Sequence, residues 1–155
     1  MITDLYPDPP RWKVAGASVR GPSHEQSGLP CQDAHRYKVI NDRLTAVVSD
    51  GAGSCRFSEF GARHLSSHLV DSLAGMPAEC ELLDHMGGIS DKWKSKVEEC
   101  ICDVQSSIVA QYVQANPVAT DTDSVQELPT LDDFSATLVG VVAGPEGGFF
   151  FHIGD

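Results

Sequence analysis

The first fifty residues alternate between short apolar segments and turn-forming residues, a pattern typical of strands. Residues 12–19 predict a first strand, and the Pro, Ser and Gly residues of 21–30 predict a loop. A second strand is expected at about 36–40, followed by a hairpin turn at residues 41–42. Residues 44–48 are nearly all apolar and partly β-branched, which predicts a buried central strand.

The spacing of apolar positions then changes from that of a strand to that of a helix. It predicts a helix over 57–74, with Ser54 or Ser58 as N-cap and Gly75 as terminator. A second, longer helix is expected to begin at the cap Ser90 and to stop at residues 116–117. The apolar stripes consist of Phe57, Phe60, Gly61, Leu65, Leu69 and Leu73 in the first helix and of Trp93, Val97, Ile101, Val104, Ile108 and Tyr112 in the second.

The last forty residues return to a strand pattern. Residues 117–133 are polar and acidic, and their length predicts an insertion or a mobile flap. Two strands follow at 135–143 and 148–153, joined by a hairpin at 144–147. Strands, two helices and strands in this order indicate an α+β fold, with helices on one face of a mainly antiparallel sheet.

Length and composition narrow the class of protein. A chain of 155 residues suits one domain, and 41% hydrophobic with 21% charged residues is ordinary for a globular protein. No segment approaches the roughly 18 apolar residues of a membrane span, and the N-terminus lacks the features of a secretion signal. Five cysteines, an odd number without C-x-x-C spacing, indicate reduced thiols. We therefore expect a soluble, cytoplasmic protein.

The charge is strongly negative and unevenly distributed. The formal net charge is −11, which disfavours nucleic acid and anionic membranes as partners. All 11 basic residues lie within residues 1–96, whereas residues 97–155 hold ten acidic residues and no Lys or Arg. These carboxylates form a solvated acidic face, or some of them face cations supplied by metal or protein.

The strongest local signal for chemistry follows the predicted central strand. Asp50 and the exposed carbonyl of Gly51 offer two hard oxygen ligands of the kind that Mg²⁺ or Mn²⁺ accepts. The alternative is an ordinary turn between a strand and a helix, in which Asp caps and Gly supplies the turn conformation. Asp33 lies at the head of the neighbouring strand, where a hairpin would bring its carboxylate near Asp50.

Two other patterns point less clearly to a site. Residues 51–53 do not form a nucleotide-binding loop, because the third Gly of the dinucleotide fingerprint and the Gly-Lys-Ser/Thr of a P-loop are missing. His64 and His68 lie one helical turn apart, which is the spacing of metal ligands, but no Glu follows in the H-E-x-x-H position. Their place beside the apolar stripe indicates packing or surface residues.

Five short motifs occur in order along the chain. They read WKVAGASVRG, CQDA, AVVSDGAGS, FSATL and HIGD, and they extend from residue 12 to residue 155. With these motifs the chain resembles the metal-dependent type 2C Ser/Thr protein phosphatases, in particular their bacterial branch.

The resemblance implies a fold, a cofactor and a reaction. The fold would be the N-terminal half of a four-layer α/β/β/α sandwich with antiparallel sheets, so that residues 1–155 form a single, incomplete phosphatase 2C-like domain. Asp50 would bridge two Mg²⁺ or Mn²⁺ ions, Gly51 would bind one of them through its carbonyl, and Asp33 would hold metal-bound water. Asp155 would face an additional metal position. The complete domain would hydrolyse phosphoserine and phosphothreonine in proteins through a bridging hydroxide, and this chain alone would be inactive.

The chain also departs from the family pattern. Gln32 stands where many relatives have Glu, Ala52 stands where others have a His that is a candidate proton donor, and no Arg precedes CQDA at the position that binds phosphate. Arg20, His24 or Arg36 are the candidates to replace that Arg. These departures keep a second hypothesis open, a non-catalytic module that binds phosphorylated partners or regulates a kinase. Under the first hypothesis the partners are a phosphorylated protein substrate and a cognate Ser/Thr kinase.

Overall fold

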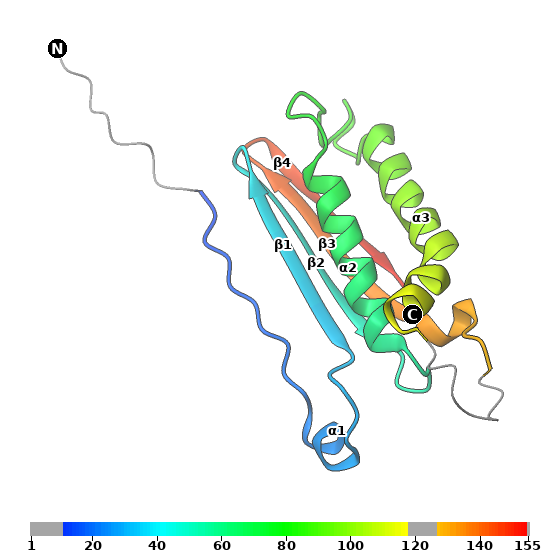
Figure 1. Cartoon of the computed structure of the whole chain (residues 1–155). Helices are drawn as coiled ribbons and strands as arrows, with labels where there is room; N and C mark the ends of the chain where they lie inside the picture. Colours follow the sequence, from blue (N-terminus) through cyan, green and yellow to red (C-terminus); the bar gives the residue numbers. More distant parts are fainter. Residues whose placement is uncertain (1–10, 118–126, 155) are drawn as a thin grey trace.

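The computed structural model describes residues 11–117 and 127–154 and shows an α+β fold, as predicted (Figure 1). One sheet and two long helices make up most of it. The elements in chain order are α1 (Pro22–Ser27), β1 (Asp33–Ile40), β2 (Arg43–Gly51), α2 (Ser58–Ala74), α3 (Asp91–Ala115), the 3₁₀ helix η1 (Leu131–Phe134), β3 (Ala136–Gly144) and β4 (Gly147–Ile153).

The sheet has four strands in the order β1-β2-β3-β4, and all neighbours are antiparallel. A two-residue turn joins β1 to β2, and its residues Asn41 and Asp42 both have positive φ, at 51° and 58°. Asn and Asp tolerate this left-handed conformation, which a hairpin turn of this length requires. The turn fixes the register of β1 against β2, with Ile40 opposite Arg43 at one end and Asp33 opposite Asp50 at the other.

Both long helices cover the same face of the sheet (Figure 1). Alternate residues of each strand point toward them, because side chains in a strand alternate between the two faces. Trp93 of α3 is fully buried and its ring meets that of Phe149 of β4 edge to face, with 5.7 Å between the ring centroids. The main core consists of Val47, Leu69, Val70, Leu73, Trp93, Val97, Cys100, Leu138, Val142 and Phe149. The predicted helical stripes therefore supply the core as expected.

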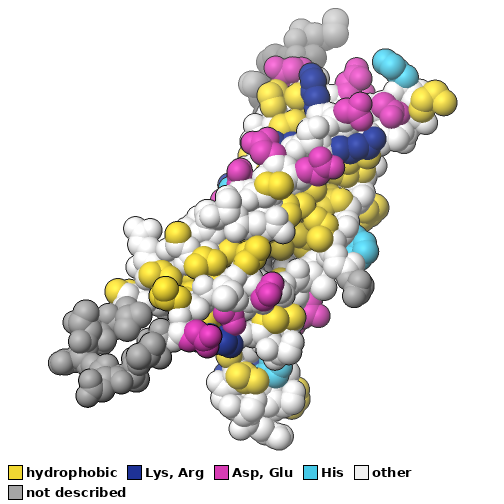
Figure 2. All heavy atoms as spheres, turned by 90° about the vertical axis from the view of Figure 1, so that its right-hand side faces the viewer, with side chains coloured by type: hydrophobic (Ala, Val, Ile, Leu, Met, Phe, Trp, Pro, Cys, Tyr) yellow, Lys and Arg dark blue, Asp and Glu magenta, His cyan; other side chains and the backbone are white. Residues whose placement is uncertain are grey.

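The opposite face of the sheet exposes several apolar side chains, and no helix among the described residues covers it. Val48 and Val139 lie opposite each other across β2 and β3 and are 55% and 46% exposed, and Phe150 of β4 is 80% exposed. One helical layer and one sheet layer are thus present, which is the half of a four-layer sandwich that the resemblance implies. The side on which α3 lies also carries a lengthwise band of hydrophobic side chains, with acidic side chains gathered at one end (Figure 2).

Two predictions about the N-terminal region are wrong. Residues 12–19 are extended but form no strand, and their contacts with the sheet run through side chains, such as the 2.8 Å hydrogen bond from Trp12 Nε1 to the carbonyl of Asp42. Gly16 lies against the ring of His35, where an added Cβ would come within 2.5 Å. A strand needs a backbone ladder with a neighbouring strand, and this segment has none among the described residues.

The second correction concerns α1, which lies within the segment predicted as a loop. Pro22 at its first position suits a helix start, because proline has the helical φ and its missing N–H is not needed there. The predicted caps of α2 are also wrong. Phe57 is the N-cap, without a side-chain hydrogen bond, and Ser58 is buried inside the first turn. The end of α2 at Gly75 and the span of α3 agree with the prediction.

None of the described helices combines the length and apolar character that crossing a lipid bilayer requires.

Candidate metal centre

Asp33 and Asp50 lie directly opposite each other where β1 begins and β2 ends. The antiparallel register pairs their Cα atoms, so both side chains project from the same face of the sheet, the one that the helices do not cover. The prediction that a hairpin brings the two carboxylates together is confirmed. The eight-residue separation between the turn and this pair leaves the two acids at the far end of the hairpin.

The two carboxyl groups interact electrostatically. Partial burial raises the pKa of Asp33 above its ordinary value, and the hydrogen bond to Asp50 and the negative charge of Asp50 raise it further. His24 of α1 acts in the opposite direction and lowers the same pKa. Two like charges this close destabilise each other's ionised form unless a cation lies between them.

No Lys or Arg side chain supplies that cation in the described part of the chain. Neither Asp33 nor Asp50 forms an ion pair there with a Lys or Arg residue. Carboxylate oxygens suit hard divalent cations such as Mg²⁺ and Mn²⁺. The pair therefore fits a metal of this class, although no three His, Cys, Asp or Glu side chains of residues 11–117 and 127–154 are arranged to hold one.

Gly51 continues the site at a point of very close backbone packing. Its N–H donates to the carbonyl of Gln32 at 3.1 Å. An added Cβ would lie 2.7 Å from the carbonyl oxygen of Ser58 and 2.9 Å from that of Gln32, closer than real Cβ contacts. Glycine is required at this position because β1, β2 and the start of α2 meet there.

Gln32 holds the start of α2 against the strands. Its side chain is buried, and Nε2 donates to Ser58 Oγ at 2.8 Å. This bond explains why Ser58 is buried inside the first turn of α2 and does not cap the helix. The amide of Gln32 is thus engaged in a contact between elements.

The loop from β2 to α2 is held by η1. The N–H of Ala52 donates to the carbonyl of Ser135 at 2.9 Å, and the N–H of Phe57 donates to that of Asp133 at 2.8 Å. Asp133 in turn accepts from the N–H of Thr130 at 2.8 Å and completes a capping box. The FSATL motif therefore begins in the segment that fixes this loop, and it continues into β3 beside β2.

The three candidates for a phosphate-binding cation have different surroundings in the structure. Arg36 lies on the face of β1 opposite to Asp33, and its Nε donates to Ser67 Oγ of α2 at 3.0 Å. The Nη1 of Arg20 donates to the carbonyl of Leu29 at 3.3 Å. His24 is the one whose charge acts on Asp33. Asp155, the fourth predicted site residue, lies outside the described residues.

Sequence reasoning missed how His24 reaches this end of the sheet, because it placed α1 within a loop. The signal was present in Gly21-Pro22, where proline follows a residue in extended conformation, as at many helix starts. The helical stripe includes Gly61 of α2 but does not predict its close contact, in which an added Cβ would lie 2.0 Å from the carbonyl oxygen of Phe134. A glycine within a helical stripe is the corresponding signal.

Comparison with known proteins agrees with the resemblance seen in the motifs. The family described as "Protein phosphatase 2C" matches residues 20–155. A curated protein of Escherichia coli (strain K12), "Serine/threonine-protein phosphatase 3", is 26% identical over 149 residues, which cover 93% of this chain and 51% of that protein. The chain thus spans about half the length of this relative. No solved structure matched significantly.

Proposed function

Because this chain belongs to the protein phosphatase 2C family, we propose that Asp33 and Asp50 are metal ligands of a phosphatase that acts on phosphoserine and phosphothreonine in proteins. The observation that carries this proposal is the pairing of the two carboxylates in the β1–β2 register, without an ion pair to Lys or Arg in the described part of the chain. The relative named as a Ser/Thr phosphatase supports the substrate class. The proposal applies to this chain together with a second half, which would correspond to the part of the relative that this chain does not match.

Each residue of the site has a role in this proposal. Asp50, in the more central of the two strands, would bridge two cations, and the carbonyl of Gly51 would bind one of them. Asp33 would position water beside them. Mg²⁺ or Mn²⁺ would supply the Lewis-acid chemistry for hydrolysis of the phosphate ester.

The contribution of the protein is to hold these oxygens in place. The hairpin fixes the two carboxylates, the close packing at Gly51 fixes the backbone, and the Gln32–Ser58 bond anchors the following helix. Rigid positioning of charged ligands is how an enzyme of this kind lowers the barrier, because the ligands need not reorganise during the reaction.

A second candidate function follows from what the site lacks. Ala52 has no acidic proton, and the amide of Gln32 is neutral and bonded to Ser58. The lack of a proton donor at positions 32 and 52 favours a module that binds phosphorylated proteins or regulates a kinase without hydrolysis.

Hydrolysis of a phosphothreonine peptide by the protein extended with the second half separates the two candidates. With Mn²⁺ we expect turnover that Asp50→Asn removes, because an amide cannot bridge two cations as a carboxylate does. Asp42→Asn is the matched control, since it makes the same change at the other end of the hairpin, where Asn tolerates the positive φ. Peptide binding without turnover would support the non-catalytic module, and turnover retained in Asp50→Asn would contradict the proposed metal ligand.

A further inference from the structure

A cavity of about 500 Å³ lies at the turn end of the β1–β2 hairpin, opposite to the end that carries Asp33 and Asp50. It is lined by residues 41 and 43 at the β1–β2 turn, by residues 78–83 of the loop between α2 and α3, and by residues 144–146 at the β3–β4 turn. These segments lie at one end of the molecule (Figure 1). The volume of this turn-end cavity is within the range of roughly 300–1,000 Å³ that is typical of pockets for small ligands.

Arg43 contributes a buried positive charge to the lining of this cavity. The residue is only 9% exposed, and its guanidinium lies over the ring of Trp93, 5.0 Å from the ring centroid. Its Nη1 donates to the carbonyl of Pro77 at 3.2 Å, and its Nη2 donates to that of Met76. Its Nε is buried without a hydrogen-bond partner, and no carboxylate of the described residues forms an ion pair with Arg43.

A buried guanidinium of this kind favours an anionic ligand over a neutral one. Buried charges in folded proteins are normally paired, because an opposite charge offsets part of the cost of removing a charge from water. The carbonyls of Met76 and Pro77 carry no formal charge, so they do not balance that of Arg43. A carboxylate does, and its two oxygens match the planar arrangement of N–H donors in a guanidinium. The buried side of the cavity therefore suits a carboxylate.

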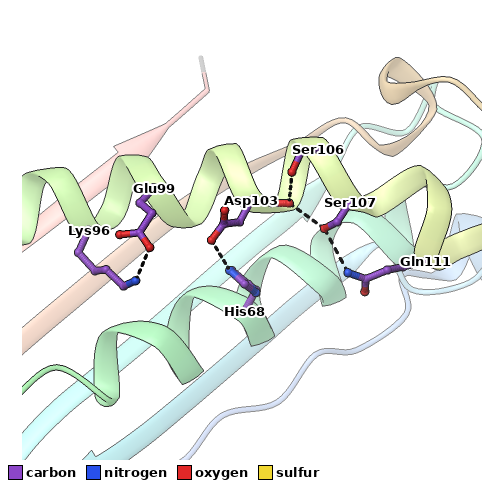
Figure 3. A network of polar contacts seen from close by, with 7 residues as sticks. All are labelled: His68, Lys96, Glu99, Asp103, Ser106, Ser107 and Gln111. Atoms are coloured by element: carbon purple, nitrogen blue, oxygen red, sulfur yellow. Dashed lines mark hydrogen bonds and ion pairs between the residues drawn. The ribbon is translucent and has the colours of Figure 1, made fainter.

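The exposed side of the cavity carries the opposite charge. The rim glutamates Glu79, Glu81 and Glu146 belong to the lining and are exposed, and none of them forms an ion pair within the described part of the chain. Glu99 of α3, in contrast, is paired with Lys96 at 2.8 Å (Figure 3). Three glutamates disfavour phosphate and other multiply charged anions in the cavity, and they favour a cationic group at its exposed side.

We propose that the turn-end cavity binds a small zwitterion that carries a carboxylate and an ammonium group at opposite ends of an apolar stem, the class of the ω-amino acids. The carboxylate accepts from the guanidinium of Arg43, and the ammonium group faces the rim glutamates. The stem lies against apolar side chains of the lining, which include those of Leu82 and Leu83. The site is independent of the proposed phosphatase function, because it shares no residue with the Asp33–Asp50 pair.

The test is a calorimetric titration of the full chain with 6-aminohexanoate at neutral pH. Hexanoate and hexylamine are the matched probes, since each keeps the apolar stem and lacks one of the two charges. We expect saturable binding of one 6-aminohexanoate per chain. Each matched probe should bind more weakly by at least about tenfold, because it loses the charge-assisted hydrogen bonds at one end of the cavity.

Variants of the two charged sides then locate the binding site. Arg43→Gln should weaken 6-aminohexanoate binding at least about tenfold, and Glu81→Gln combined with Glu146→Gln should weaken it about threefold or more. The combined glutamate variant changes only exposed residues, so it keeps the proposal testable if Arg43→Gln does not fold.

The control is Glu98→Gln, which changes an exposed glutamate of α3 outside the cavity and should leave the affinity unchanged. The proposal is overturned if 6-aminohexanoate does not bind, or if hexanoate or hexylamine binds as tightly as 6-aminohexanoate does. It is also overturned if folded Arg43→Gln or the combined glutamate variant binds 6-aminohexanoate as tightly as the parent.

Discussion

Replacing Gly51 by Ala tests whether close packing holds the candidate metal centre together. The new Cβ would lie 2.7 Å from the carbonyl oxygen of Ser58, 2.8 Å from the carbonyl carbon of Ser58 and 2.9 Å from the carbonyl oxygen of Gln32. All three atoms belong to the backbone, so no flexible side chain can move aside. The start of α2 or the residue before β1 must shift by several tenths of an ångström.

The expected loss of stability follows from two opposing effects. Overpacking of this kind costs roughly 1–3 kcal/mol. Replacing glycine also reduces the entropy of the unfolded chain, which returns roughly 0.4–1 kcal/mol where the native φ suits alanine. Gly51 does not have positive φ, so this gain applies, and we expect a net destabilisation of about 1–2 kcal/mol.

Gly53→Ala is the matched control two residues away. Its Cβ would meet only Gln32 Oε1, at an ordinary 3.7 Å, and its φ is not positive either. This variant should be as stable as the parent or slightly more stable. The two variants should therefore differ by about 2 kcal/mol, which for a chain of this size is a Tm difference of about 4–8 °C.

The assay is urea unfolding of the full chain, followed by the fluorescence of the buried Trp93. If the free energies of unfolding of Gly51→Ala and Gly53→Ala differ by less than about 0.5 kcal/mol, the close packing at Gly51 is refuted. Substitutions at the surface without structural effect change the stability by no more than this.

Two further predictions concern individual carboxylates. Asp33→Asn should stabilise the metal-free chain slightly, by up to about 0.5 kcal/mol given the exposure of the site, because it removes a carboxylate whose pKa is raised first by partial burial and then by Asp50. Unfolding in EDTA measures this, and a less stable variant would contradict the inferred destabilisation of the charged form. The pKa of Asp84 is lowered, first by the hydrogen bond from the N–H of Gly88 and then by the one from the N–H of Met86. The ionised Asp84 therefore stabilises the fold above the ordinary pKa of 3.8, and this stabilisation is lost as the pH falls through the lower pKa of the folded state. Asp84→Asn should therefore reduce the difference in urea stability between pH 6 and pH 3, and an unchanged difference would show that these bonds do not stabilise the loop.

Local sequence predicted the hairpin and the long helices because their determinants are local. Asn41 and Asp42 specify the turn that sets the β1–β2 register, and that register alone places Asp33 opposite Asp50. The helical spacing of apolar residues likewise predicts that Trp93 faces the core, and Trp93 is fully buried there. The encounter of two acids was thus predictable from the sequence.

Features that depend on distant contacts could not be predicted in the same way. Residues 12–19 have the composition of a strand, but a strand exists only where a partner offers its backbone groups. The role of Ser58 depends on Gln32, 26 residues earlier, and the need for glycine at 61 depends on the carbonyl of Phe134. Each of these features depends on residues that are distant in the sequence, so the local sequence pattern does not predict it.

The central claim, that Asp33 and Asp50 form a metal site, is tested most directly by paramagnetic broadening of amide signals with Mn²⁺. Carboxylate oxygens suit Mn²⁺ better than imidazoles do, so the ion reports on this pair in preference to the histidines of α2. At low Mn²⁺ concentration, the amide signals of Asp33, Asp50 and Gly51 should broaden first, and Asp50→Asn should remove this effect while Asp42→Asn leaves it unchanged. Broadening that begins elsewhere in the chain, or that persists in Asp50→Asn, would contradict the assignment of this metal centre.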